Sequence, residues 1–286
     1  MKIKSTRIKK LIDRATRMLE HARIPKFSSK YSPKLYTQHQ HTVMLMLKKY
    51  FKATYRDITD ILEEMTRIRE LLKLKRIPHY TTLQKFFDRI RDSLLYSLLM
   101  KITRAFIIAI DSTGFSSRYA SKYYEQRFFK DVQKRRFQKM AIAADVRKQT
   151  ILNIYTEEGP SYDYKNLIPL MQPLQAKYVV ADKGYDSEKN IRFIMEKNAI
   201  PVIAIRGRPT RTKLRKRVKR NFSKYVKVYH QRPKVESIFS VIKRKFGEHL
   251  FSRKLSLRNK EIMLNGITYN AYKGIYCLVT MFSTEL

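Results

Sequence analysis

The sequence feature that most constrains the fold is a change of hydrophobic periodicity near Ala105. Before this point, over Thr37–Tyr96, apolar residues recur with the 3.6-residue spacing that is typical of helices. After it, the apolar run Phe106–Ile110 is unbroken and ends in Asp111, as in a strand that is buried on both faces. The sequence therefore predicts a helical N-terminal region followed by a region that contains a sheet.

The second region is predicted to be an α/β domain. Strand-like runs alternate with amphipathic stretches in a βββαβαβ order, which indicates a partly parallel sheet with helices packed against it. The expected strands are Phe106–Ile110, Lys139–Ala144, Thr150–Tyr155, Tyr178–Ala181 and Pro201–Ile205, and the expected helices are Tyr164–Gln175, Ser187–Lys197 and Pro233–Phe246. We expect two domains, a small all-α domain at residues 1–100 and the α/β domain at residues 101–286.

The charge of the chain favours a polyanionic partner. Its 62 Lys and Arg residues exceed its 24 Asp and Glu residues, which gives a formal net charge of +38. Hydrophobic residues still make up 43% of the sequence, so the chain is expected to fold. Nucleic acid is the expected partner, because neutralising a polyanion releases many counterions at once. With no long apolar span and no signal-peptide pattern, we expect a cytoplasmic, nucleoid-associated protein without a membrane partner.

Three acidic residues are candidates for a metal site. Asp111 and Asp182 each follow an apolar run, at the strand ends where open α/β sheets place their sites. Glu236 lies beside the apolar stripe of the last predicted helix. The single Cys277 and the absence of paired histidines exclude thiolate metal sites, so a metal must bind oxygen, as Mg²⁺ does. Two such ions about 4 Å apart can activate an attacking oxygen and stabilise a leaving one in phosphodiester chemistry.

Ordinary structural roles remain open for each of these acids. An Asp after a strand is most often a turn or N-cap residue, and a Glu on a basic helix usually forms a surface salt bridge. Asp186 is expected to cap the helix that starts at Ser187, with a supporting role in catalysis as the alternative. Ser112 and Thr113 would also suit a hydrolase in which Asp111 is the nucleophile, but the sequence has no matching base or phosphate loop.

The spacing around Glu236 carries a resemblance to a known family. Tyr229 is followed after two residues by Arg232, after three more by Glu236 and after six more by Lys243. This string resembles the Y-R-E-K signature of the DDE transposases of bacterial and archaeal insertion sequences, in the RNase H-like, integrase-like superfamily. Because Pro233 suits the first turn of a helix, Tyr229 and Arg232 are expected just before that helix.

Two further strings agree with this resemblance. FIIAIDSTGF around Asp111 resembles the first-aspartate strand of the family, and VVADKGYDS around Asp182 resembles its second-aspartate motif. The resemblance covers about residues 105–250 in the family's order, and more loosely the helical N-terminal region. It implies an RNase H-like mixed sheet flanked by helices. The interval from Asp182 to Glu236 includes no large β-rich insertion, so a DNA hairpin intermediate is not expected.

The resemblance also implies roles for individual residues. Asp111, Asp182 and Glu236 would be the catalytic triad that binds two Mg²⁺ or Mn²⁺ ions. The residues that would contact DNA at or near the cleaved phosphate are Tyr229, Arg232 and Lys243. Arg forks and Lys point charges suit phosphate contacts.

Other cationic segments are candidates for DNA contact. The loop Phe115–Phe137, with Arg118 and Arg127, interleaves cations with aromatic residues that could stack on unpaired bases, although a packed loop with solvated charges is equally compatible. The basic run Arg206–Arg220 suits a phosphate track, with a disordered basic link as the alternative.

The helical N-terminal region offers a possible helix-turn-helix. Its predicted helices, Asp57–Leu74 and Thr82–Arg91, could place Lys85 and Arg89 of the second helix at DNA, with Thr81 or Thr82 as that helix's N-cap. An all-α cap without contacts in a DNA groove fits the pattern as well.

The family resemblance implies a transposase. Such a protein binds the terminal inverted repeats of a mobile element, cleaves DNA at the element's ends and transfers the 3′-OH ends to target DNA. Its partners would be double-stranded DNA and a second copy in a homodimeric synaptic complex. The alternatives are an RNase H-like metal-dependent nuclease or an inactive copy that binds DNA. From another class, a non-enzymatic DNA- or RNA-binding protein could use the acids to balance local charge.

Overall fold

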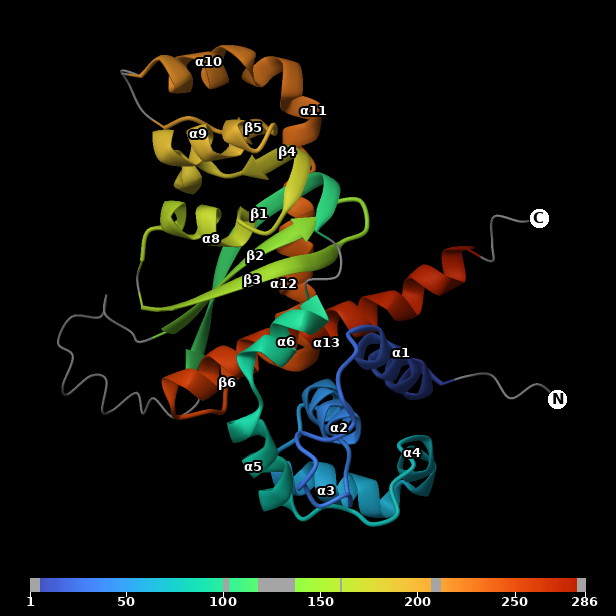
Figure 1. The fold of residues 1–286 in the computed structure, drawn as a ribbon. Coiled ribbons are helices and arrows are strands. Elements are labelled where there is room, and N and C mark those ends of the chain that lie inside the picture. The colour runs from blue at the N-terminus through green and yellow to red at the C-terminus, as the bar shows by residue number, and fades with distance from the viewer. Residues whose placement is uncertain (1–5, 100–102, 118–136, 160, 207–211, 282–286) are drawn as a thin grey trace. The chain divides into compact units, whose positions relative to one another are not determined.

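The computed structural model describes residues 6–99, 103–117, 137–159, 161–206 and 212–281 (Figure 1). The chain divides into two compact units. One is helical and contains residues 1–98, 244–247 and 263–286. The other is built around a sheet and contains residues 99–243 and 248–262.

The helical unit begins with short helices. They are α1 (Arg7–His21), α2 (Gln38–Phe51), α3 (Tyr55–Glu64), α4 (Thr66–Leu71), α5 (Tyr80–Arg89) and α6 (Asp92–Leu99). Capping boxes fix two of the starts, since Thr37 and Gln40 cap α2 and Thr54 and Asp57 cap α3. The helix α13 (Leu255–Met281), which the sequence analysis did not predict, contributes to both units.

Two predicted helix boundaries in this unit are wrong. The expected helix Asp57–Leu74 is broken at Met65, whose φ of −94° and ψ of 75° separate α3 from α4. The apolar period continues across the break, so periodicity could not reveal it. Met65 itself, which the period assigned to the buried face, is 45% exposed. The next helix begins earlier than expected, with His79 as the N-cap residue of α5 in place of Thr81 or Thr82.

The predicted mixed α/β fold is confirmed in the second unit. Its strands are β1 (Arg104–Ser117), β2 (Phe137–Asp145), β3 (Thr150–Glu158), β4 (Gln175–Ala181), β5 (Ile200–Ile203) and β6 (His249–Leu250). The sheet order is β3-β2-β1-β4-β5, with β6 paired to β1. The first three strands are antiparallel, whereas β4 and β5 run parallel to β1. The central strand β1 thus joins the antiparallel and parallel halves.

Helices connect and cover this sheet. They are α8 (Leu167–Met171), α9 (Glu188–Glu196), α10 (Lys213–Asn221), α11 (Val226–Tyr229) and α12 (Pro233–Phe246), with short 3₁₀ turns at Asp163–Asn166, Lys183–Tyr185 and Phe222–Tyr225. Leu167, Leu170, Ile191 and Ile194 of α8 and α9 pack in one core with the sheet. In Figure 1, α12 runs behind β1. None of the helices in the described ranges has the length and apolarity that a membrane crossing requires.

Two predicted elements of the sheet unit differ in length. The strand expected to end at Asp111 continues to Ser117, because Ser112–Ser116 stays paired with β2. The helix expected over Tyr164–Gln175 is a 3₁₀ turn followed by the short α8, which ends two residues before Pro173. Gln175 already belongs to β4.

Candidate active site

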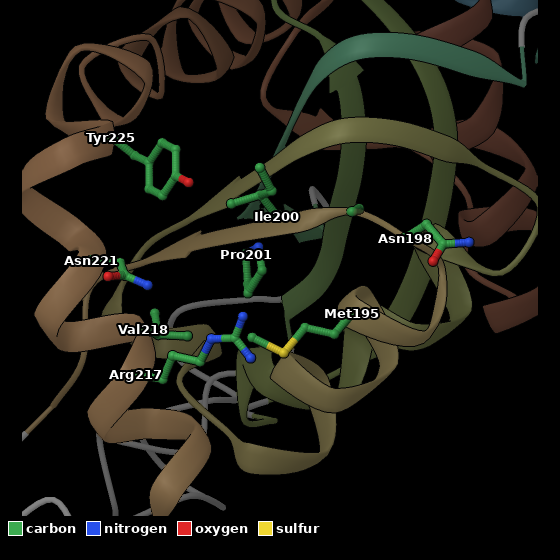
Figure 2. Close-up of a pocket in the computed structure, with 9 residues that line it drawn as sticks. Met195, Asn198, Ile200, Pro201, Arg217, Val218, Asn221 and Tyr225 are labelled. Atoms are coloured by element: carbon green, nitrogen blue, oxygen red, sulfur yellow. The ribbon is translucent and has the colours of Figure 1, made fainter.

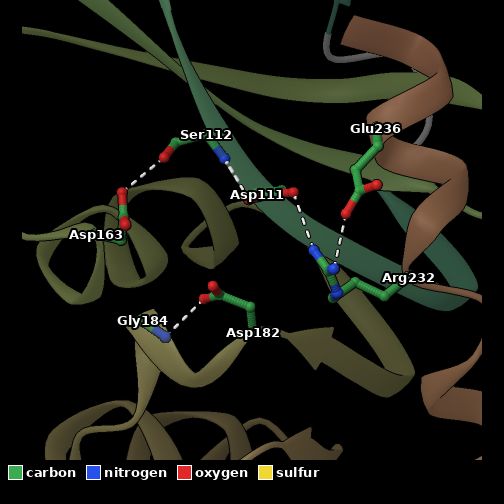
Figure 3. A network of polar contacts seen from close by, with 7 residues as sticks. All are labelled: Asp111, Ser112, Asp163, Asp182, Gly184, Arg232 and Glu236. Carbon is green, nitrogen blue, oxygen red and sulfur yellow. Dashed lines mark hydrogen bonds and ion pairs between the residues drawn. The ribbon is translucent and has the colours of Figure 1, made fainter. Parts of the chain in front are cut away.

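The strand register brings the first two acids side by side. In the parallel pair β1–β4, Ile110 lies opposite Ala181, so Asp111 and Asp182 follow a matched pair of residues. Asp182 caps the 3₁₀ turn after β4, where its Oδ1 accepts a hydrogen bond from the Gly184 N–H at 2.7 Å. Asp111 Oδ1 accepts one from the Ser112 N–H at 2.9 Å (Figure 3). Both carboxylates are therefore held by backbone donors at one edge of the parallel half.

Arg232 links Asp111 to the third acid. It lies in the turn before Pro233, and Glu236 lies in the first turn of α12. The guanidinium donates from Nη1 to Asp111 Oδ2 at 3.2 Å and from Nη2 to Glu236 Oε1 at 2.7 Å. Figure 3 shows Arg232 between the two carboxylates. Glu236 thus reaches Asp111 through a cation and not directly.

The environment makes Asp111 hard to ionise. Burial raises the pKa of this carboxyl to about 6, and the charges of Asp182 and Glu236 act in the same direction. The Ser112 N–H and the Arg232 guanidinium oppose this rise without cancelling it. Additional positive charge at this place would therefore stabilise the ionised site.

The donor set fits a hard divalent cation in its chemistry. Asp111, Asp182 and Glu236 offer only carboxylate oxygens, the ligands that Mg²⁺ prefers. In the arrangement seen, no three acidic, His or Cys side chains of the described ranges group closely enough to hold a metal ion. The contact of Arg232 with both Asp111 and Glu236 accounts for the wider spacing.

The remaining Y-R-E-K residues lie nearby along the chain. As expected, Tyr229 ends α11 and Arg232 precedes α12, so neither lies on the face of the last helix. The Tyr229 ring packs edge-on against Phe222, with centroids 5.0 Å apart. Lys243 Nζ lies 5.5 Å from the ring centroid of Phe115 in β1.

The structure does not test the other predicted DNA contacts. Arg118 and Arg127 fall outside the described residues. Lys85 and Arg89 are exposed on α5 of the helical unit, where Arg89 Nε donates to the Lys85 carbonyl at 3.1 Å. The contact of these four residues with DNA therefore stays a prediction.

A second polar group near Asp111 was missed by the sequence analysis. Ser112 Oγ donates to Asp163 Oδ1 at 2.6 Å, and Lys139 of β2 forms an ion pair with the same carboxylate. Tyr185 is fully buried, and burial raises its pKa well above 10, with the charges of Asp163 and Asp111 adding to the effect. Asp163 comes from the β3–β4 connection and has no motif around it, so only the fold reveals this contact.

The expected role of Asp186 is wrong. Ser187 is the N-cap residue of α9. The Asp186 carboxylate instead binds Arg215 of α10 and the backbone N–H of Arg206. Two basic residues of the run Arg206–Arg220 supply these donors, about twenty or more positions farther along the chain.

A separate hollow lies beside α10. Figure 2 shows this cavity of about 370 Å³ between the α9–β5 segment and α10. Its lining residues are Met195, Asn198, Ala199, Ile200, Pro201, Arg217, Val218, Asn221 and Tyr225. Arg217 of the predicted basic run is among them, but Asp111, Asp182 and Glu236 are not, so the acids do not belong to this hollow.

Comparisons with known proteins agree with the fold. The family model described as the transposase DDE domain matches residues 104–271. An uncharacterized protein of Aquifex aeolicus (strain VF5) is 21% identical over 262 residues, which cover 84% of this chain and 78% of that protein. The piggyBac transposase, in a cryo-EM structure of its synaptic complex with hairpin DNA, superposes with a TM-score of 0.53 at 12% identity, covering 96% of this chain and 75% of that one. At such low identity, this likeness concerns the fold.

Proposed function

Because the chain belongs to the DDE transposase family, as its match over residues 104–271 shows, we propose that it binds the terminal inverted repeats of a mobile element, cleaves DNA at the element's ends and transfers the 3′-OH ends to target DNA. The single observation that carries this proposal is the meeting of three segments. Asp111 and Asp182 follow matched positions of parallel strands, and the Arg232–Glu236 segment reaches Asp111. Function is argued from this site, since a fold alone hosts many activities.

The three acids are the proposed metal ligands. Asp111, Asp182 and Glu236 would hold two Mg²⁺ or Mn²⁺ ions through their carboxylate oxygens. When bound, such ions supply activation of the attacking oxygen and stabilisation of the leaving oxygen of a phosphodiester. The chain itself orients Asp111 through the Ser112 N–H and Asp182 through the Gly184 N–H.

Arg232 is proposed to exchange partners when DNA binds. Its guanidinium is shared between Asp111 and Glu236, and the Glu236 carboxylate is 54% exposed. A DNA phosphate offers Arg232 a bidentate partner, which its planar fork matches well. Turning to that phosphate would release both carboxylates for metal ions. Tyr229 and Lys243 would add contacts to the same strand.

Recognition of the element's ends is proposed for the helical N-terminal residues 1–100, with Lys85 and Arg89 of α5 at the DNA. Arg118 and Arg127, which belong to the proposed catalytic domain of residues 101–286, would also contact the DNA. Because two ends must be joined, we propose that the active form is a homodimer on double-stranded DNA. Between Asp182 and Glu236, the only strand in the described residues is β5, so these residues contain no large β-rich insertion. We therefore propose that the DNA ends are cut without a hairpin intermediate.

Cleavage of labelled DNA that carries the element's own ends tests this function. We expect cuts at the element boundary with Mg²⁺ and none with EDTA, and we expect Glu236→Gln to abolish them. Glu248→Gln, a change of the same kind at an exposed residue outside the site, is the matched control and should cut normally. Denaturing analysis of the products should show linear ends. Cutting by Glu236→Gln at the normal rate would remove Glu236 from the site.

A further inference from the structure

The loop after Asp182 is tied to α10 by a buried ion pair. The Asp186 side chain is only 1% exposed. Its Oδ1 accepts from Arg215 Nε at 3.0 Å, and its Oδ2 accepts from Arg215 Nη2 at 2.5 Å and from the Arg206 N–H at 2.7 Å. Arg215 also donates to the Arg206 carbonyl at 3.0 Å. The backbone of Arg206 is therefore held on both sides.

Helix α10 divides its residues between anchoring and exposure. Val218 is buried in the core and Leu214 packs against that core, while Arg215 turns toward Asp186. Of the remaining cations, Arg217 lines the hollow beside α10, and the helical period places the others on the outward side. We define the basic face of α10 as the exposed residues Lys213, Lys216, Lys219 and Arg220.

This basic face has no acidic partner in the described part of the chain. The helix KLRKRVKRN contains no Asp or Glu, and none of the ion pairs formed within the described ranges involves the basic face. Like charges at i, i+3 and i, i+4 repel each other, so a helix of this composition is stabilised by an anionic partner. A row of phosphates is the partner that neutralises several such charges together.

Arg206 extends the positive charge to the candidate site. A Cβ atom on Gly184 would lie 2.8 Å from Asp182 Oδ1, 3.2 Å from Asp163 Oδ2 and 3.5 Å from Arg206 Nη2. The three side chains therefore converge over Gly184, where only a glycine leaves room for them. The exposed Arg206 guanidinium thus approaches the same side of Gly184 as Asp182, whereas Arg232 forms an ion pair with Asp111.

We propose that Arg206 and the basic face of α10 form a phosphate-binding surface for duplex DNA, and that the Asp186–Arg215 pair fixes this surface beside Asp182. The proposal rests on the proposed function in one respect, that the DNA held there is the strand presented to Asp182. Asp186 and Arg215 are positioning residues, since they contact Arg206 and not the DNA.

The salt dependence of duplex binding in EDTA tests the surface without catalysis. Each lost phosphate contact should reduce the slope of log binding constant against log salt by about 0.9, so Lys216→Ala/Arg220→Ala should reduce it by about 1.8 and Arg206→Ala by about 0.9. The matched control Lys189→Ala/Arg192→Ala removes two charges from the exposed side of the neighbouring α9 and should leave the slope unchanged. Equal slopes for the α10 variant and this control would overturn the proposal, as would a natural chain that binds no duplex.

A double-mutant cycle tests the positioning role. Arg215→Lys keeps the charge but loses the fork on Asp186 and Arg206, and should weaken binding about tenfold. In the Arg206→Ala/Lys216→Ala/Arg220→Ala background its further effect should be much smaller, because Arg206 and half of the basic face that it positions are gone. Additive effects would instead mean a general structural role.

Cleavage by the same variants separates this inference from the proposed function. If the α10 variants bind like the control while Mg²⁺-dependent cuts still require Glu236, only the phosphate-binding surface is wrong. If the α10 variants lose binding as expected but no cuts occur in the natural chain, the surface stands and the transposase activity is wrong.

Discussion

Two arginine–carboxylate contacts in the sheet unit use the same groups in opposite ways. Arg215 binds the buried Asp186 through two donors, Nε and Nη2, and the Arg206 backbone N–H completes the contact. Arg232 divides its guanidinium between two acids, and one of them, Glu236, is 54% exposed. We call the Asp186–Arg215 contact closed, because its carboxylate is buried, and it suits a residue that holds α10 in place. We call the Arg232 contact open, because Glu236 is exposed to solvent, and it suits an arginine that exchanges a carboxylate for a phosphate.

The largest expected difference between the two contacts is in stability. Arg215→Ala leaves the buried Asp186 carboxylate without its cation, which should cost about 3–5 kcal/mol of unfolding free energy. Arg232→Ala removes contacts that are partly open to water and should cost about 1 kcal/mol or less. Urea unfolding in EDTA measures both, with Arg192→Ala as a control for an exposed ion pair. Equal losses of unfolding free energy for Arg215→Ala and Arg232→Ala would contradict the distinction between a closed and an open contact.

Replacement by Asn should change the unfolding free energy in opposite directions at Asp111 and at Asp186. Because the folded-state pKa of Asp111 is about 6 against an ordinary value of 3.8, the natural chain loses part of its unfolding free energy as the pH rises from 3.8 to about 6. Asp111→Asn removes this loss and should stabilise the fold by about 3 kcal/mol at pH 8, with no gain below pH 3.8. Asp186→Asn should destabilise at pH 8, because a charge-assisted fork is lost.

Thermal unfolding of both variants in EDTA across this pH range makes the comparison. If the Asp111→Asn variant were less stable than the natural chain at pH 8, burial of the ionised Asp111 carboxylate would not be destabilising. Asp186→Asn that is more stable there would show that the Arg215 contact is not a support.

The smallest expected effect is on salt dependence. If Arg232 turns to a phosphate, Arg232→Ala and Lys243→Ala should each reduce the salt slope of end-DNA binding by about 0.9. A slope for Arg232→Ala that equals that of the natural chain would leave this arginine as a structural residue.

The closed and open contacts also differ in how far sequence could predict them. The strings around Asp111, Asp182 and Arg232–Glu236 are local, so the sequence predicted that each aspartate follows a strand. Only the fold shows that the two strands, β1 and β4, are parallel neighbours. The Asp186–Arg215 contact joins residues 29 positions apart, with α9 and β5 between them in the sequence. A local pattern of Asp186 before Ser187 favoured a helix cap, and tertiary contact overrode it.

Two other misses have the same physical origin. Asp163 meets Ser112 because the β3–β4 connection returns to β1, which no spacing of residues predicts. The break at Met65 keeps the apolar period intact, so the pattern predicted one helix where the backbone forms two. Periodicity reports which face is buried, whereas backbone breaks and long-range polar pairs depend on the packed fold.

Joining of pre-cut ends tests whether the chain transfers 3′-OH ends to target DNA with the help of Glu236. DNA that already carries the element's 3′-OH ends is incubated with a supercoiled plasmid, and the joined products are counted for the natural chain, Glu236→Gln and the control Glu248→Gln. The account predicts Mg²⁺-dependent joining by the natural chain and the control, and none by Glu236→Gln or in EDTA. Nicking of the plasmid without joining would contradict it and would identify a metal-dependent nuclease.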